Sequence, residues 1–205
     1  MAASSLQDLY AQKLYLLLDA EQQIISALPQ LAQRAGDERL RDALEHHHRE
    51  TETHAQRLQQ LVQSRGQSAQ QTQCISMRAL IQEGQQMLPT IKDPDTIDAF
   101  IIAAAQAVEH HEIAAYGTAR AWARQLGYDD DADLLQQTLD EEGKADQLLT
   151  RIAEQSVNEQ ASDSADREVQ LTSGGQGDRA QSSGSGSSGS RSSVDSSVNR
   201  AADGR

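Results

Sequence analysis

The sequence has almost none of the residues that crosslink a chain or anchor it in a membrane. Cys74 is the only cysteine among 205 residues, so an intrachain disulfide is excluded, as is typical of proteins in reducing compartments. No uncharged apolar run approaches the length of a membrane span, and the chain does not open with a basic segment followed by an apolar one. We therefore expect a cytoplasmic protein with no membrane contact.

Basic residues are also scarce. Lysine and arginine number 18 against 31 aspartates and glutamates, which gives a net charge of −13. The acidic excess lies almost wholly in residues 1–160, with 25 acidic and 13 basic residues. Such a surface repels nucleic acid and anionic lipid and attracts divalent cations. Nucleic acid is therefore not an expected partner, whereas metal ions are.

Alternating β-branched residues are rare, whereas apolar residues recur at the three- and four-residue steps of a helix face. This periodicity predicts four long helices, spanning about residues 5–35, 38–64, 94–126 and 129–157, and a short one at 74–87. Pro29 predicts a kink or an early end in the first helix. The other boundaries are marked by capping residues and breakers: Ser4 or Ser5, Asp37 and Asp93 at the starts, and Gly36, Gly66 and Gly127 after the ends.

These elements predict an all-α fold, an antiparallel four-helix bundle with a crossover that contains a short helix. The bundle forms one domain over residues 1–160. Residues 161–205 are rich in serine and glycine, with almost nothing to bury, and are expected to form a disordered tail.

Each of the four apolar stripes is interrupted at mid-length by carboxylates or histidines. A buried carboxylate costs several kcal/mol unless something neutralises it, and no lysine or arginine lies on these stripes. Because the midpoints of antiparallel helices meet, the polar residues should meet too, and we interpret them as ligands of a shared metal. The candidates are Glu21 in the first helix, Glu50 and His54 in the second, Glu109 and Glu112 in the third, and Glu142 and Asp146 in the fourth.

A set rich in carboxylates with one or two imidazoles suits iron or manganese better than zinc. Of the three consecutive histidines at 46–48, only one can face the seam, and we expect His47 to lie beside the ligands rather than among them. Tyr116 is expected in the core, near the site. Glu45 and Glu141 lie off the stripes and are expected at the surface. Cys74 is expected to be a small buried hydrophobe, and no hydrolase triad is indicated.

Several longer segments resemble a known family: LLDAEQQIISALPQLA, HHRETETHAQRL, QCISMRALIQEG, QAVEHHEIAAYGTARAWA and LDEEGKADQLL. They are similar to the YciE/YciF group of bacterial stress proteins in the ferritin-like superfamily, over about residues 6–157. The resemblance implies a ferritin-like bundle with a di-iron-type centre, in a homodimer, and supports the seven candidate ligands. One difference is that ferritin-like proteins generally place histidine three residues after glutamate, whereas His54 follows Glu50 by four and Asp146 stands where histidine is expected.

The implied function is oxidation chemistry in a stress response: two iron ions reacting with O₂ or peroxide, as a ferroxidase or a peroxide-consuming protein. Manganese with catalase-like activity is an alternative, as is a bundle that binds metal or a partner without catalysis. Glu50 and Glu142 are predicted to bridge the metals, with Glu21 and Glu109 or Glu112 as terminal ligands. A dimer without a mineral core is expected rather than a storage cage.

Overall fold

The computed structural model describes residues 4–64 and 72–164, and within these ranges every regular element is helical. The predicted all-α fold is confirmed. The elements are α1 (Leu6–Arg34), α2 (Glu38–Ser64), α3 (Ile75–Met87), the 3₁₀ turn η1 (Leu88–Thr90), α4 (Pro94–Gln125), α5 (Asp129–Ile152) and the π-helical turn η2 (Ala153–Val157).

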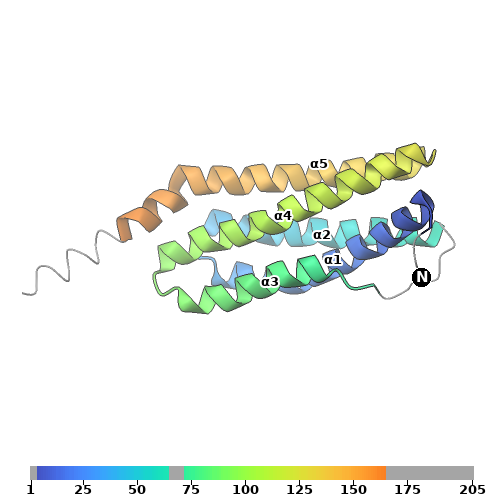
Figure 1. Cartoon of the computed structure of the whole chain (residues 1–205). Coiled ribbons are helices and arrows are strands. Elements are labelled where there is room, and N and C mark those ends of the chain that lie inside the picture. The colour runs from blue at the N-terminus through green and yellow to red at the C-terminus, as the bar shows by residue number, and fades with distance from the viewer. Residues whose placement is uncertain (1–3, 65–71, 165–205) are drawn as a thin grey trace, which may run out of the picture.

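The four long helices form an elongated bundle (Figure 1). α1 packs mainly along α2, and α4 packs mainly along α5, while smaller contacts of α1 with α4 and of α2 with α5 close the bundle. The short helix α3 lies on the outside, against α1 and α4. It belongs to the predicted crossover, which carries the chain from the end of α2 to the start of α4.

The predicted caps hold the starts of three long helices. The Ser5 hydroxyl accepts the Asp8 N–H at 3.1 Å, an Asp37 carboxylate oxygen accepts the Leu40 N–H at 3.2 Å, and Asp93 accepts the Thr96 N–H at 2.8 Å. Each bond satisfies a backbone donor that has no partner within its helix. Between α4 and α5 the chain turns at Gly127, whose φ of 75° favours glycine.

Pro29 does not end α1, so the alternative of an early stop is wrong. The helix continues to Arg34 with Pro29 on its exposed side. Proline removes one backbone hydrogen bond, and at an exposed position water can bind the carbonyl that loses its partner. Packing of the buried face on both sides of Pro29 keeps the helix intact.

The helical part also extends slightly further than the sequence predicted. After η2 the chain remains helical through residue 164, so residues 161–164 do not belong to a disordered tail. The Ser164 hydroxyl bonds the Asp95 carboxylate of α4 at 2.9 Å, which ties this last turn to the bundle. The rest of the predicted tail, residues 165–205, lies outside the described residues, as do residues 65–71 of the predicted connection.

Two apolar clusters fill the bundle, one toward each end. One centres on the second half of α1 and the first half of α4, with Ile24, Leu28 and Ile101 among its members. The other centres on the first half of α1 and the second half of α4, with Leu14 and Ala119 among its members. The polar stripe positions lie between the two clusters. None of the helices in the described ranges has the combined length and hydropathy needed to cross a membrane.

A buried carboxylate holds the turn between α1 and α2 against α4. Asp98 accepts the backbone N–H of Gly36 at 2.8 Å and that of Asp37 at 2.7 Å. A Cβ on residue 36 would lie 3.2 Å from an Asp98 oxygen, so glycine allows this close approach.

We therefore expect Asp98→Ala to lower the free energy of unfolding by about 2–3 kcal/mol, because two backbone donors lose a charged acceptor. Chemical denaturation followed by circular dichroism measures the change. Asp133→Ala, at an exposed position of α5, is the control and should change stability by less than about 0.5 kcal/mol. Equal stability of the two variants would contradict the role given to Asp98.

Candidate metal centre

Six ionisable side chains meet in a layer between the two apolar clusters. They come from all four long helices, and each residue is at most 5% exposed. The layer consists of Glu21 from α1, His47 and His54 from α2, Glu109 and Glu112 from α4, and Glu142 from α5. A buried set with four carboxylates is unfavourable in a bundle core unless positive charge compensates it.

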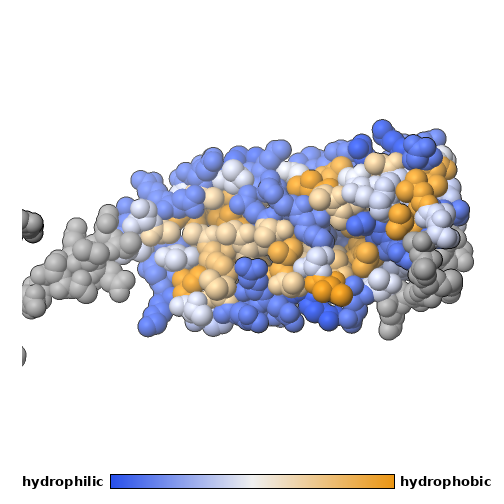
Figure 2. Space-filling model, viewed as in Figure 1, coloured by the Kyte–Doolittle hydropathy of each residue, from blue (hydrophilic) through white to orange (hydrophobic). Residues whose placement is uncertain are grey.

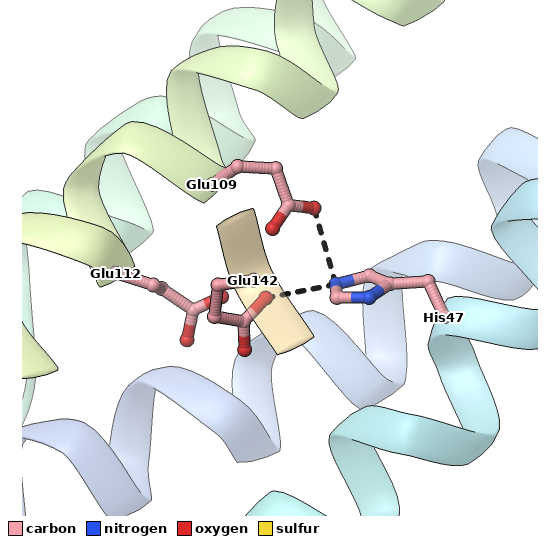
Figure 3. Close-up of side chains that lie close together, drawn as sticks. All are labelled: His47, Glu109, Glu112 and Glu142. Carbon is pink, nitrogen blue, oxygen red and sulfur yellow. Dashed lines mark ion pairs between the residues drawn. The ribbon is translucent and has the colours of Figure 1, made fainter. Parts of the chain in front are cut away.

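The six side chains form two groups that share one residue. In the first group, one donor atom from each of His47, Glu109, Glu112 and Glu142 lies within 4.8 Å of the others (Figure 3). In the second, donor atoms of Glu21, His54 and Glu142 do the same. Each group has the size and composition of a metal-ion site, and Glu142 belongs to both.

The two oxygens of Glu142 face different histidines. Oε2 lies 3.7 Å from His47 Nε2, which also lies 3.1 Å from Glu109 Oε1 (Figure 3). Oε1 lies 2.8 Å from His54 Nδ1, which is also 3.7 Å from Glu21. Glu142 therefore stands between the groups, in a position where its carboxylate can serve both.

The layer contains many buried polar atoms without a hydrogen-bond partner. Within the described part of the chain, nine such atoms belong to it. They include both oxygens of Glu112, whereas the oxygens of Glu142 have only their ion-pair contacts with the two histidines. Buried polar atoms are nearly always hydrogen-bonded in folded proteins, so a concentration of unpaired acceptors needs a physical explanation. Cations among these oxygens and nitrogens would supply one, because they would bind the lone pairs that no donor occupies.

The raised pKa values of three glutamates show that their charged forms are unfavourable in this arrangement. Burial raises the pKa of Glu21 to about 8 and that of Glu109 to about 7. Burial, together with the charges of Glu21 and Glu142, holds the pKa of Glu112 well above its usual value. Without added positive charge, the layer favours the protonated forms of these three groups.

Glu142 and the histidines respond in the opposite sense. Burial alone would raise the pKa of Glu142, but its contacts with His54 and His47 outweigh that effect and lower it. Burial opposes the charged form of both imidazoles, yet the adjacent carboxylates raise the pKa of both His47 and His54. Without metal, the protonated forms of the two histidines therefore supply the positive charge of the layer.

Five of the seven predicted ligands lie in the layer, and two lie outside both groups. Glu50 is half-exposed, and its carboxylate contacts His46 at 3.4 Å and the outer nitrogen of His47 at 3.8 Å. Asp146, like Glu50, is only partly buried. It accepts hydrogen bonds from Gln106 and His110 of α4 at 3.0 and 3.1 Å. The structure thus does not bring Glu50 or Asp146 into the layer.

The path of the buried stripe along α2 explains why Glu50 lies outside the layer. From His47 to His54 the stripe can pass through residue 50 or residue 51, because a helix turn of 3.6 residues permits either a three-four or a four-three step. The structure buries Thr51 completely and turns Glu50 outward. Its partner His47 is the one of the three consecutive histidines that turns inward, as predicted, but it lies in the first group itself rather than beside it.

Glu141 lies beside the layer, although its position off the apolar stripe predicted a surface residue. Its carboxylate lies 2.9 Å from His54 Nε2 and is bound by the Arg57 guanidinium. A carboxylate on one imidazole nitrogen orients the other, and here Nδ1 faces the second group. The available signal was the spacing of His54 and Arg57, which puts both on one face of α2. Tyr116 donates a hydrogen bond to Glu21, so it lines the layer as expected.

The chain as a whole is similar to several known proteins, and the match extends over the residues that contain the layer. A family described as a domain of unknown function, DUF892, matches residues 5–162. Protein YciF of Escherichia coli K12 is 37% identical over 166 residues, which cover 80% of this chain and all of the relative. The crystal structure of the E. coli stress protein YciF matches with a TM-score of 0.73, covering 76% of this chain and 99% of that one at 37% identity. The structure of YcfI from Rhodopseudomonas palustris matches with a TM-score of 0.70, covering 72% and 94% at 39% identity.

The shifted pKa values predict a pH dependence for the metal-free protein. A glutamate whose pKa rises on folding binds more protons when folded, so stability falls as pH rises from its ordinary value of 4.5 through the folded values of about 7 and about 8. Histidines with raised pKa values lose their stabilising charge as pH rises above 6.5, which acts in the same direction.

In EDTA, the melting temperature should therefore decrease between about pH 5 and about pH 8. Thermal melts followed by circular dichroism measure it. Glu112→Gln has one titrating group fewer and should show a smaller decrease. A melting temperature that is constant or increases over this range would show that the layer is not buried as described.

Proposed function

Because this chain belongs to the DUF892 family and is related to the stress protein YciF, we propose that it is a stress-response protein with a di-iron centre that consumes O₂ or peroxide. The observation that carries the proposal is the buried layer of four glutamates and two histidines, in which nine buried polar atoms lack a hydrogen bond. Four carboxylate charges match two divalent cations.

The donor set fits iron. Oxygen donors with one imidazole at each metal suit iron or manganese, whereas zinc and copper sites usually carry more nitrogen or sulfur. His47, Glu109, Glu112 and Glu142 would hold one ion, and Glu21, His54 and Glu142 the other. Glu142 would bridge the two, since each of its oxygens faces a different histidine.

Two ferrous ions, when bound, supply the two electrons that reduction of O₂ to peroxide or of peroxide to water requires. The residues around the layer orient its side chains and limit its contact with water. Glu141 and Arg57 hold the His54 ring so that Nδ1 faces the second group. Tyr116 keeps one oxygen of Glu21 occupied by a hydrogen bond. The apolar clusters at both ends limit the access of water to the carboxylates.

Metal content should depend on the layer and not on surface charge. The wild-type protein is expected to hold about two ions per chain after growth with added iron, and Glu142→Ala should lose both, because it serves both groups. Elemental analysis of purified protein measures this. Glu45→Ala, at an exposed position of α2, is the control with the same change in charge and should keep the wild-type content.

Glu50→Ala separates the two assignments of this residue. As a bridging ligand, as the sequence predicted, its loss would reduce metal content as much as Glu142→Ala does. As a partner of the outer face of His47, its loss should leave most of the metal bound. Equal losses in the Glu45, Glu50 and Glu142 variants would mean that the metal merely binds an acidic surface.

The reaction class is tested by stopped-flow absorbance after Fe²⁺-loaded protein is mixed with O₂ or with hydrogen peroxide. We expect fast formation of ferric product in the wild type and at least about a hundredfold slower formation in Glu142→Ala. Sustained oxygen evolution from peroxide by the manganese-loaded protein would instead favour a catalase-like activity. If neither occurs, the bundle binds metal structurally or acts through a partner.

The family resemblance also implies a homodimer, which we propose for this chain. A dimer, rather than a storage cage, leaves no enclosed interior for a mineral core. Analytical ultracentrifugation of the full chain distinguishes the two, and a species of twelve or more chains would contradict the dimer.

A further inference from the structure

The layer is buried, so an ion that comes from solvent must pass between side chains that are more exposed than the layer itself. Each of the six layer residues is at most 5% exposed. A divalent cation gives up its hydration water at low cost only where oxygen or nitrogen atoms of the protein take the place of that water. An approach that suits an ion therefore has ligand atoms between the surface and the layer.

The approach between α1, α3 and α4 is mainly apolar. A cavity of about 390 Å³ lies there, with Ile24, Leu28 and Val108 among its lining residues. Figure 2 shows apolar side chains gathered on the face over α3 and α4. Apart from the buried Glu109, the one lining residue with a charged side chain is the exposed Arg34, whose positive charge repels cations. This side of the layer therefore offers little to an ion.

On α2, in contrast, ligand atoms lead from the surface to the layer. His46 Nε2 lies 3.4 Å from Glu50 Oε1, and Glu50 Oε2 lies 3.8 Å from His47 Nδ1. The other nitrogen of the His47 ring lies 3.1 Å from Glu109 Oε1, in the first group. Side-chain exposure decreases along this path, from 61% at His46 through 30% at Glu50 to 6% at His47.

The inner end of the path is a buried nitrogen without a hydrogen bond. His47 Nδ1 is closed to solvent and has no hydrogen-bond partner within the described ranges. Its contact with Glu50, at 3.8 Å, is longer than a hydrogen bond. Such buried nitrogens are rare in folded proteins, and this one points out of the layer toward a half-exposed carboxylate. The ring thus has one nitrogen toward the first group and the other toward Glu50.

The outer end of the path has the spacing of two ligands on one ion. Two donor atoms that each lie about 2.1 Å from a metal are roughly 3.0–3.5 Å apart, depending on the angle between them. His46 Nε2 and Glu50 Oε1, at 3.4 Å, fall within this range. One imidazole and one carboxylate suit iron or manganese, and the remaining ligands at such a surface position would be water.

Glu50 differs in this respect from the two other partly exposed carboxylates near the layer. Glu141 also contacts a layer histidine, but the Arg57 guanidinium binds its carboxylate and supplies a positive charge. Asp146 accepts hydrogen bonds from two side chains of α4 that lie outside the layer. Glu50 contacts only histidines within the described part of the chain, so its carboxylate is the one that is open to a cation.

We propose that His46 and Glu50 form a receiving site for divalent cations, from which an ion passes along the His47 ring into the first group. The proposal rests on the di-iron function, because it describes how the layer is filled. A receiving site changes the route of the ion and not the energy of the filled layer. Its loss therefore slows uptake and release by the same factor and leaves the dissociation constant unchanged.

Rates of metal exchange on the full-length protein test this route. Uptake is followed by stopped-flow after metal-free protein is mixed with Mn²⁺ and a fluorescent metal indicator. Release is followed after Mn²⁺-loaded protein is mixed with an excess of a chelating indicator. Glu50→Gln and His46→Ala should each slow both rates about tenfold, because the local attraction that guides the cation is lost, with a dissociation constant within about twofold of the wild type.

Glu52→Gln and His48→Ala are the matched controls. Both residues lie on α2 next to the path, Glu52 is exposed, and neither belongs to the two groups of the layer. Each control makes the same change of residue type as one of the test variants, and each should exchange metal as the wild type does. Circular dichroism and melting temperature confirm that every variant is folded.

Two kinetic results would overturn the proposal. One is exchange of Mn²⁺ by both test variants at the rates of their controls. The other is faster release with a raised dissociation constant in both, which would mean that His46 and Glu50 merely hold the His47 ring in place. In either case the layer still binds metal, so the di-iron function is unaffected.

The receiving site is also tested in protein whose layer is disabled. In Glu142→Ala, substoichiometric Mn²⁺ should broaden the ring NMR signals of His46 more than those of His48, and adding Glu50→Gln should remove the difference. Equal broadening of the two rings in Glu142→Ala would overturn the site. Failure of the wild type to take up Mn²⁺ or iron, together with selective broadening at His46, would instead overturn the di-iron function and leave the surface site standing.

Discussion

The mutual repulsion of four buried carboxylates is the constraint on which this structure depends. Glu21, Glu109, Glu112 and Glu142 occupy the middle of a bundle whose two ends are filled with apolar side chains. Such a layer by itself lowers the stability of the protein, and the cations proposed to bind there would raise it, because charges that repel one another attract the ion. The long, well-capped helices supply the packing that keeps the layer together.

The layer is asymmetric, and its neighbours explain the asymmetry. His54 is held by Glu141, which Arg57 binds in turn, whereas the outer nitrogen of His47 faces only the half-exposed Glu50 at 3.8 Å. The first group therefore has more carboxylates and a more loosely held imidazole, and the second has fewer donors and a fixed imidazole. The proposal of two bound metal ions therefore implies two positions of different affinity, with Glu142 common to both.

The crossover forms one wall of an apolar cavity next to the layer. α3 returns the chain along α1 and α4, and its packing leaves the apolar cavity that extends to Glu109. Asp19 anchors the start of this segment by accepting the Cys74 N–H at 2.7 Å, and Cys74 is buried there as expected of a small hydrophobe. The match to the E. coli YciF structure covers 99% of that structure, so the two proteins share the fold of the bundle.

The sequence by itself determined the helices and the depth of the site. Local signals were sufficient for this, because a cap such as Ser5 or Asp93 acts within one turn, and an apolar stripe with a polar centre is visible along a single helix. Only the tertiary structure decided which side chains meet. Glu50 or Thr51 can continue the stripe of α2 equally well, and the choice depends on how the helix is rotated against its neighbours. The positions of Asp146 and Glu141 depend on the tertiary structure in the same way. Asp146 turns toward Gln106 and His110 of α4, and Glu141 turns toward His54 and Arg57 of α2. Such partners lie far apart in the sequence, and no periodicity within one helix specifies the distance between two.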